Sequence, residues 1–427
     1  MFIESCKPER NQYTDYFIWT DSSWKWEIPG YRVISGYSQR DGCYISNFFY
    51  FQPALNYGFA NPDPAHPWQQ PMDAPGPLSV RQEIKNIIRY WLNLGASGFR
   101  VDMAGWLVKG DPGSRGTMKI WQEIRAWLDE EYPGACLFSE WGNPSLAIQA
   151  GFHADFCLPF GMPGYTALLR KPYGRGPGND PYGVSFFDSS GHGNIKEFLD
   201  DYMNHYETTH GMGHIILPTG NHDINPRVSK GRTIADLKLV YLFILTMPGI
   251  PAIWYGDEIG MRSVDSIASK EGGYNRTGSR TPMQWDDSRN AGFSTAAPEY
   301  LYLPIDPEEQ IPSVLQQQDD PDSLLHCVRV LSEIRHTHTA LQASSKFEVL
   351  FAQPGVCPLV YLRSNENESL IVAINPSDKP VETTIPAISI NIPQTLFGFE
   401  DAISIDGECW KIHLSGFAGG IYQVKRD

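Results

Sequence analysis

Apolar side chains recur at helical spacing in several long segments of the chain. In the segment 78–95 they come every three or four residues up to Gly95, which is typical of a helix with one buried face. Shorter, mostly apolar runs lie between these segments and are typical of buried strands. The pattern predicts helices at 78–95, 116–133, 195–207, 232–249 and 323–341, and strands at 98–104, 135–141, 152–160, 214–223 and 250–261.

Strands that alternate with helices form βα units around a parallel sheet, so the fold class is α/β. Each predicted strand also ends in polar residues, among them Asp102, Glu140, Asp155, Asp223 and Asp257. A doubly wound sheet gathers its ligand contacts at one switch point, whereas a (β/α)8 barrel of the TIM type carries them at many strand ends. The pattern therefore favours the barrel.

The character of the chain changes beyond residue 345. Short alternating runs at 359–364, 369–375, 410–416 and 420–425 are separated by turn residues, and this predicts an all-β domain of the sandwich type. We expect three parts, which are a loop-rich region at 1–75, a barrel portion with the carboxylates at 76–344, and the β-sandwich at 345–427.

Charge and cysteine content narrow the range of partners. Lys and Arg number 34 against 49 Asp and Glu, and this net charge of −15 disfavours nucleic acid and anionic membranes. The seven cysteines are scattered and odd in number, which indicates reduced thiols. No run resembles a membrane span or a signal peptide, so we expect a cytoplasmic protein. The sequence leaves the oligomeric state open.

Two opposite charges, Arg100 and Asp102, interrupt the apolar strand 98–104. Side chains of a strand alternate between faces, so both charges are expected on the same face. A buried ion pair is a poor stabilising device because desolvation offsets much of its Coulombic gain. We therefore favour a functional pair at the mouth of the barrel, with a structural pair as the alternative.

Glu140 ends its strand among apolar and aromatic neighbours, where desolvation would raise its pKa and suit a general acid. Arg100 should keep Asp102 ionised, which suits a nucleophile. Two carboxylates in unlike environments are the groups that glycoside hydrolysis requires. His222 and Asp223 add a neutral donor and a further carboxylate. Each residue alone has a structural alternative, such as a helix cap, a solvated acid or a core histidine.

Several segments carry a family resemblance. The segments 98–104, 137–141 and 219–223 resemble, in order, motifs of the α-amylase superfamily of glycoside hydrolases, family 13. The segment 51–56 resembles its shorter additional motif, and 250–261 and 280–293 resemble α-glucosidase and trehalose-synthase-like members.

The resemblance implies a retaining enzyme that acts on α-linked glucosides or α-glucans through a glycosyl-enzyme intermediate. It implies that Asp102 is the nucleophile, Glu140 the acid/base, and Asp223 the residue that stabilises the distorted sugar. It further implies substrate contacts for Arg100, His222 and Arg227. The region 1–75 would then be the remnant of a loop domain of the B type.

Departures from the family pattern refine this expectation. Endo-acting α-amylases commonly carry a Lys-His pair after the nucleophile, but here Gly105 and Trp106 stand in that region. We therefore expect short α-glucosides as substrates. Ala54 stands where the additional motif often has Asp, which removes its usual polar role.

The family's first motif is not found in the chain, and the segment 11–21 resembles what ordinarily follows it. The resemblance thus predicts that three strands, two helices and this motif precede Met1, and that the 427-residue chain alone is inactive and poorly folded.

No cofactor or metal motif stands out. His210 and His214 are four residues apart, but no third ligand is near them in the sequence. The glycine-rich segment 271–280 lacks the order of a phosphate-binding loop and suits a substrate-side loop. Calcium, which the family often binds, would be held by segments that the chain does not show.

Two alternatives to the hydrolase stay open. One is a transglycosylase or trehalose-forming isomerase of the same superfamily. The other is a non-catalytic relative that acts as a scaffold or carbohydrate-binding protein.

Overall fold

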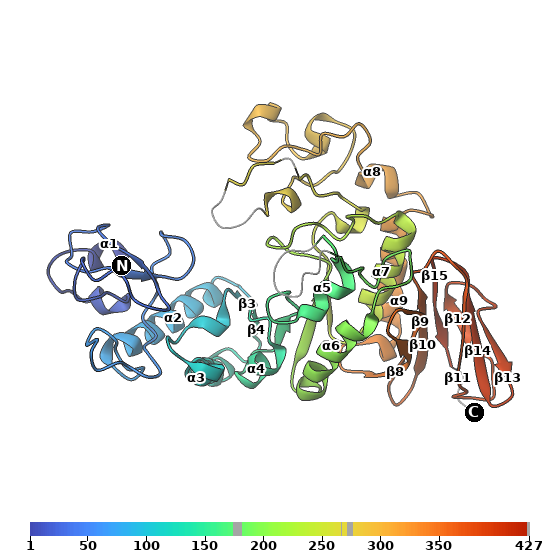
Figure 1. The fold of residues 1–427 in the computed structure, drawn as a ribbon, viewed down its shortest axis with the longest axis horizontal. Coiled ribbons are helices and arrows are strands. Elements are labelled where there is room, and N and C mark those ends of the chain that lie inside the picture. Colours follow the sequence, from blue (N-terminus) through green and yellow to red (C-terminus); the bar gives the residue numbers. More distant parts are fainter. Residues whose placement is uncertain (174–181, 266, 271–275, 425–427) are drawn as a thin grey trace. The chain divides into compact units, whose positions relative to one another are not determined.

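Two compact units make up the chain in the computed structural model, which describes residues 1–173, 182–265, 267–270 and 276–424 (Figure 1). Residues 1–141 and 145–155 form the first unit, and residues 142–144 and those from 156 onward form the second. The helices are α1 (Phe2–Ser5), α2 (Pro75–Asn93), α3 (Arg115–Glu131), α4 (Pro144–Gln149), α5 (Pro163–Leu169), α6 (Ile195–Thr209), α7 (Ile234–Thr246), α8 (Val314–Gln317) and α9 (Leu324–Thr337).

The strands before residue 345 are short. They are β1 (Arg32–Ile34), β2 (Tyr44–Ser46), β3 (Gly98–Val101), β4 (Cys136–Ser139), β5 (Ala154–Phe156), β6 (His214–Pro218) and β7 (Ile250–Ala252). The later strands are β8 (Lys346–Gln353), β9 (Val356–Ser364), β10 (Ser369–Asn375), β11 (Val381–Pro386), β12 (Gln394–Phe397), β13 (Ile403–Asp406), β14 (Cys409–Leu414) and β15 (Ala418–Gln423).

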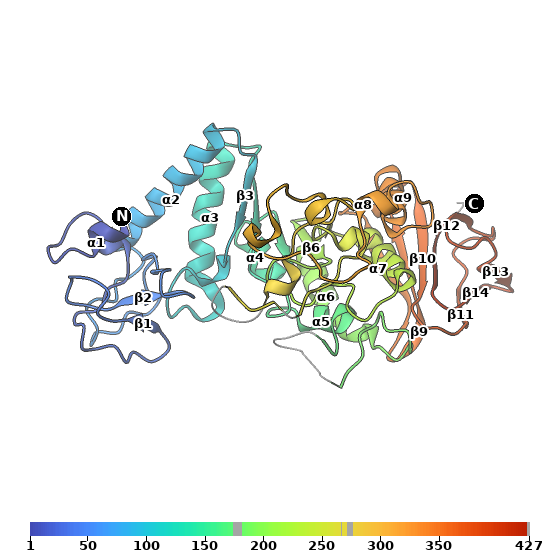
Figure 2. The same ribbon diagram turned by 90° about the horizontal axis from the view of Figure 1, so that it is seen from above.

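The first unit holds two βα repeats that position the first charged motifs. α2 and α3 lie side by side (Figure 2), and Arg81 of α2 donates a hydrogen bond of 2.7 Å to Glu123 of α3. β3 and β4 pair in parallel with Val101 opposite Ser139, so both strands end at the same edge. The buried core against which this pair packs includes Val80, Ile120, Ile124, Leu128 and Leu137.

The second unit continues the pattern with β6 and β7, which pair in parallel with Ile216 opposite Ile250. α7 between them is buried on nearly all sides, and Thr233 and Asp236 close a capping box at its start. Arg335 of α9 donates hydrogen bonds to the carbonyls of Leu245, Met247 and Gly249 at 2.7, 3.0 and 2.7 Å. These bonds fix the end of α7 directly before β7.

The C-terminal strands form two antiparallel sheets. One has the order β12-β15-β10-β9-β8 and the other the order β11-β14-β13. Trp410 is fully buried in the core of these strands, together with Ile371, Ile385 and Ile412. α7 contacts β10 and β15, so this sheet shares a hydrophobic core with the helices of the second unit.

The structure confirms the parallel βα units and the all-β region after residue 345. The strands of the βα units are shorter than the sequence predicts. β3 ends at Val101 because the chain turns at Met103, whose φ is +46°. β7 ends at Ala252, well before the predicted limit of 261. The periodicity of the sequence missed β8, β11, β12 and β13, in part because exposed polar residues interrupt them.

The described residues contain the five predicted parallel strands, β3 to β7, whereas a closed barrel of this class has eight strands. The division at residues 75 and 345 stays a prediction. Among the described residues, no helix is long and apolar enough to cross a membrane.

Candidate active site

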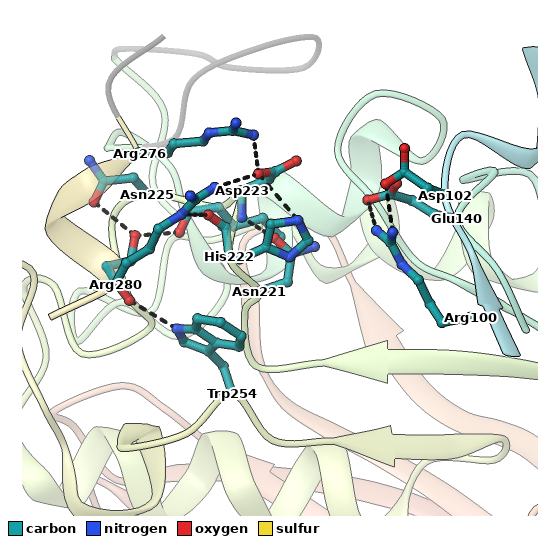
Figure 3. Close-up of polar contacts among 12 residues, drawn as sticks. Arg100, Asp102, Glu140, Asn221, His222, Asp223, Asn225, Trp254, Arg276 and Arg280 are labelled. Carbon is teal, nitrogen blue, oxygen red and sulfur yellow. Dashed lines mark hydrogen bonds and ion pairs between the residues drawn. The ribbon is translucent and has the colours of Figure 1, made fainter. Parts of the chain in front are cut away.

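Two neighbouring strand ends of the first unit bring Arg100, Asp102 and Glu140 together (Figure 3). Arg100 lies in β3, and Asp102 follows in the turn after it. The prediction that both side chains share one face of a continuous strand therefore does not apply to Asp102. Glu140 follows β4 directly. The amide of Glu140 donates to the carbonyl of Val101 at 2.8 Å, and this bond ties the two strand ends to each other.

Arg100 bridges the two carboxylates. Its Nη1 lies 2.6 Å from Oδ1 of Asp102, and its Nη2 lies 2.5 Å from Oε1 of Glu140. The expected pair of Arg100 and Asp102 is therefore present, and the guanidinium serves a second acid that the sequence did not link to it. A planar guanidinium can contact two carboxylates at once because its donors are fixed in a fork.

The two carboxylates differ strongly in exposure. The side chain of Asp102 is 71% exposed, whereas that of Glu140 is 7% exposed. Burial, with a smaller contribution from the charge of Asp102, raises the pKa of Glu140 to about 7 against the opposing effect of Arg100. Desolvation thus outweighs an ion pair of 2.5 Å, and the prediction of a raised pKa for Glu140 is confirmed.

Hydrogen bonds on both sides of Glu140 hold its backbone in place. The fully buried Asp155 accepts from the hydroxyl of Ser139 at 2.7 Å and from the amide of Trp141 at 2.9 Å. Gly105 packs against the indole of Trp141, and a Cβ at Gly105 would lie 2.4 Å from Nε1 of that ring. Any side chain at position 105 would clash with the indole, which explains why glycine stands there.

Within the second unit, His222 and Asp223 lie on the loop after β6 (Figure 3). Oδ1 of Asp223 forms ion pairs with Arg276 and with Nη2 of Arg280, the latter at 3.0 Å. Nε2 of His222 lies 3.5 Å from the same oxygen. The side chains of two arginines and one histidine therefore surround Oδ1 of Asp223.

Further contacts fasten the segment of Arg280 to the loop that carries Asp223. Nε of Arg280 donates to the carbonyl of His222 at 2.6 Å. The hydroxyl of Ser279 donates to the carbonyl of Ile224 at 2.7 Å. Nε1 of Trp254, after β7, donates to the carbonyl of Ser279 at 3.0 Å. Segments that are far apart in the sequence thus fix the position of Asp223.

Arg227, expected to contact substrate, lies elsewhere. Its side chain is fully buried and pairs with the equally buried Asp257 at 2.9 Å. It also donates to the carbonyl of Tyr255 at 2.7 Å. In the structure this guanidinium offers no exposed surface to a sugar, and its contacts instead fix the loop after β7.

The sequence did not identify Arg276 and Arg280 as partners of Asp223. They belong to the glycine-rich segment that suggested a substrate-side loop, of which residues 271–275 lie outside the described residues. Two arginines four residues apart stand out in this segment, but their spacing does not indicate a partner. Their contact with Asp223, more than 50 positions away, depends on tertiary structure.

Comparison with protein families gives two matches along the chain. Residues 1–344 match the α-amylase catalytic domain, and residues 347–421 match the C-terminal domain of maltogenic amylase. The chain belongs to the α-amylase family. Its resemblance to family 13 glycoside hydrolases is therefore confirmed, and its curated relatives include glycoside-acting enzymes.

Curated relatives of this α-amylase family protein include two types of enzyme. Trehalose synthase/amylase TreS of Mycobacterium tuberculosis is 26% identical over 426 residues, which is 88% of this chain and 64% of that protein. The chain thus spans less than two thirds of the length of TreS. Oligo-1,6-glucosidase of Parageobacillus thermoglucosidasius is 25% identical over 487 residues, covering 99% of this chain and 80% of that enzyme.

Solved structures with this fold include isomaltulose synthase from Erwinia rhapontici NX5. It has a TM-score of 0.75 and 20% identity, and the match covers all of this chain and 80% of that one. Trehalulose synthase MutB from Pseudomonas mesoacidophila MX-45 has a TM-score of 0.74 and 22% identity, over 99% and 80% of the two chains. At these identities the likeness shows the fold alone, and the neighbours include TIM-barrel amylases.

The bridge by Arg100 predicts opposite shifts for two neighbouring substitutions. Arg100→Gln removes a cation and should raise the pKa of Glu140 further, whereas Asp102→Asn removes an anion and should lower it. Carboxylate infrared or NMR titration, with Glu140→Gln to assign the signal, measures both. Asp406→Asn in β13 is the control. Shifts of the same sign in both variants would contradict the bridge.

Proposed function

We propose that the protein is a retaining glycosidase of α-linked glucosides, with Asp102 as the nucleophile and Glu140 as the acid/base. One observation carries the proposal. A single guanidinium holds an exposed carboxylate and a buried carboxyl whose pKa is raised to about 7. Retaining glycosidases need such a pair, because one group must attack as an anion while the other donates a proton.

The proposed reaction has two steps. The carboxylate of Asp102 attacks the anomeric carbon while Glu140 donates its proton to the leaving glycosidic oxygen, so an ester to Asp102 forms as the glycosidic bond breaks. Glu140, now a carboxylate, takes a proton from water as that water attacks the anomeric carbon and displaces the carboxylate of Asp102. The sugar leaves with a hydroxyl, Asp102 regains its charge and Glu140 its proton.

Asp223 receives its role from the family resemblance, which assigns it to stabilising the distorted sugar. Its ion pairs with Arg276 and Arg280 support a fixed carboxylate at this position. His222 and Arg100 are proposed substrate contacts. We do not extend this proposal to Arg227 because its side chain is fully buried.

Short α-glucosides are the proposed substrates. Gly105 lies against Trp141 and leaves no side chain to grip a long glucan. The relative oligo-1,6-glucosidase, matched over 99% of this chain, also supports a glucosidase. We further propose a cytoplasmic location, which the seven free cysteines support.

Transfer to a sugar is the second candidate, since several relatives are named trehalose synthases. The first step would be the same, but a sugar hydroxyl would attack the anomeric carbon of the ester in place of water and displace the carboxylate of Asp102.

A non-catalytic role is the third candidate, because another relative is named amino acid transporter heavy chain SLC3A1. The unlike environments of Asp102 and Glu140 favour catalysis over this third candidate.

Product analysis on maltose separates the three candidates. We expect the protein to release glucose with the α-anomer formed first, because two displacements retain configuration. Chromatography identifies the sugars and early proton NMR the anomer. Trehalose as the main product would establish isomerisation instead. No turnover of maltose or of an aryl α-glucoside would contradict catalysis altogether.

Replacing the proposed acid should affect substrates unequally. Glu140→Gln should lower kcat/KM on maltose by about 10²-fold or more, but far less on a nitrophenyl α-glucoside, whose leaving group needs little protonation. In the unchanged protein, kcat/KM on maltose should fall as pH rises through about 7, because the proton on Glu140 is lost.

The control for this prediction is Glu130→Gln, on the exposed side of α3, which should leave both substrates unaffected. Equal losses on maltose and on the nitrophenyl glucoside would remove Glu140 from the role of acid.

A further inference from the structure

We propose that a tryptophan-lined pocket in the N-terminal region binds an α-glucan chain as a second carbohydrate site. The pocket has a volume of about 350 Å³ and none of Arg100, Asp102 and Glu140 lines it. Its lining residues are Asp21, Trp24, Lys25, Trp26, Glu27, Ile28, His66 and Trp68. The choice of an α-linked glucose polymer as the ligand rests on the α-glucoside specificity of the proposed function, whereas the expectation of short substrates concerns the catalytic groups and not this pocket.

Trp68 forms a fixed wall of this pocket. Its ring lies 5.8 Å from Phe59 in an edge-to-face contact, and Phe59 is buried. On another side, the ring of His66 lies 5.6 Å from Trp68, and Nδ1 of His66 contacts Oδ2 of Asp63 at 2.9 Å. Neighbours on two sides therefore set the orientation of the indole.

Trp24 and Trp26 are exposed on a backbone that is itself well held. Their residues are 88% and 53% exposed, which is costly for such large apolar side chains unless a partner covers them. Yet the amide of Ser23 donates to Asp41 at 2.8 Å, and the carbonyl of Ser23 accepts from the hydroxyl of Ser35 at 2.7 Å. The loop thus presents the two indoles from an anchored position.

The polar lining fits a neutral ligand rich in hydroxyl groups. Asp21 and Glu27 offer acceptors, whereas Lys25 and His66 offer donors, and Lys25 already pairs with Asp21 at 3.1 Å. Two carboxylates against one lysine disfavour a phosphorylated or otherwise anionic ligand. Indole faces combined with a few polar groups match a sugar ring, which has an apolar face and a polar rim. The volume is at the lower end for a small-molecule pocket and suits a short stretch of glucan.

Affinity electrophoresis in gels that contain glycogen tests this site. The double variant Trp24→Ala, Trp26→Ala should bind glycogen about tenfold more weakly, since it removes two indole faces on which a sugar ring can stack. Its thermal midpoint should not change, because both side chains are exposed. Trp91→Ala on α2, a residue 50% exposed, is the matched control and should bind like the unchanged protein.

The same variants separate this site from the proposed catalysis. The double variant should keep kcat/KM on a nitrophenyl α-glucoside within twofold while it loses glycogen binding. If the protein hydrolyses no glucoside but the tryptophan-dependent binding remains, the proposed function fails and this site stands. Unchanged glycogen binding in the double variant would overturn the site. A dimer in sedimentation that the double variant abolishes would also overturn it, because a second copy would then be the occupant.

Discussion

The contact of Arg100 with both Asp102 and Glu140 is the interaction on which the account of this protein depends. One cation between two acids cannot neutralise both, so their environments decide how the negative charge is shared. Glu140 is buried and Asp102 is exposed, and desolvation therefore outweighs the nearby guanidinium at Glu140. The result is one acid that keeps its proton near neutral pH beside one that faces solvent.

The fold provides this difference in exposure through short strands and tight loops. β3 and β4 end in register, and Asp155 holds the residues on either side of Glu140. Gly105 allows the loop after Asp102 to pack on Trp141, the residue that follows the glutamate. In the second unit, Arg280 and Ser279 fix the loop of Asp223 in a comparable way. Backbone and side-chain hydrogen bonds thus hold the segments that carry the proposed catalytic groups.

Sequence reasoning recovered what local pattern determines. The helical spacing that ends at Gly95 located α2, and the apolar neighbours of Glu140 correctly indicated a raised pKa. It did not recover what depends on long-range contact. Nothing in the sequence near Arg280 indicates that it contacts Asp223. An arginine in a loop is expected to be exposed, but Arg227 is buried in an ion pair with Asp257. The sequence also did not predict that β3 ends before Asp102, because a positive φ is unusual for methionine and Met103 adopts one.

Covalent trapping tests the central claim most directly. A fluorinated α-glucosyl fluoride that slows breakdown of the ester should leave one sugar bound to the protein, and peptide mass spectrometry should place it on Asp102. The Asp102→Asn variant should remain unlabelled under the same conditions. A sugar attached to Glu140 or to any other residue, or steady release of glucose by the Asp102→Asn variant, would contradict the assignment of the nucleophile.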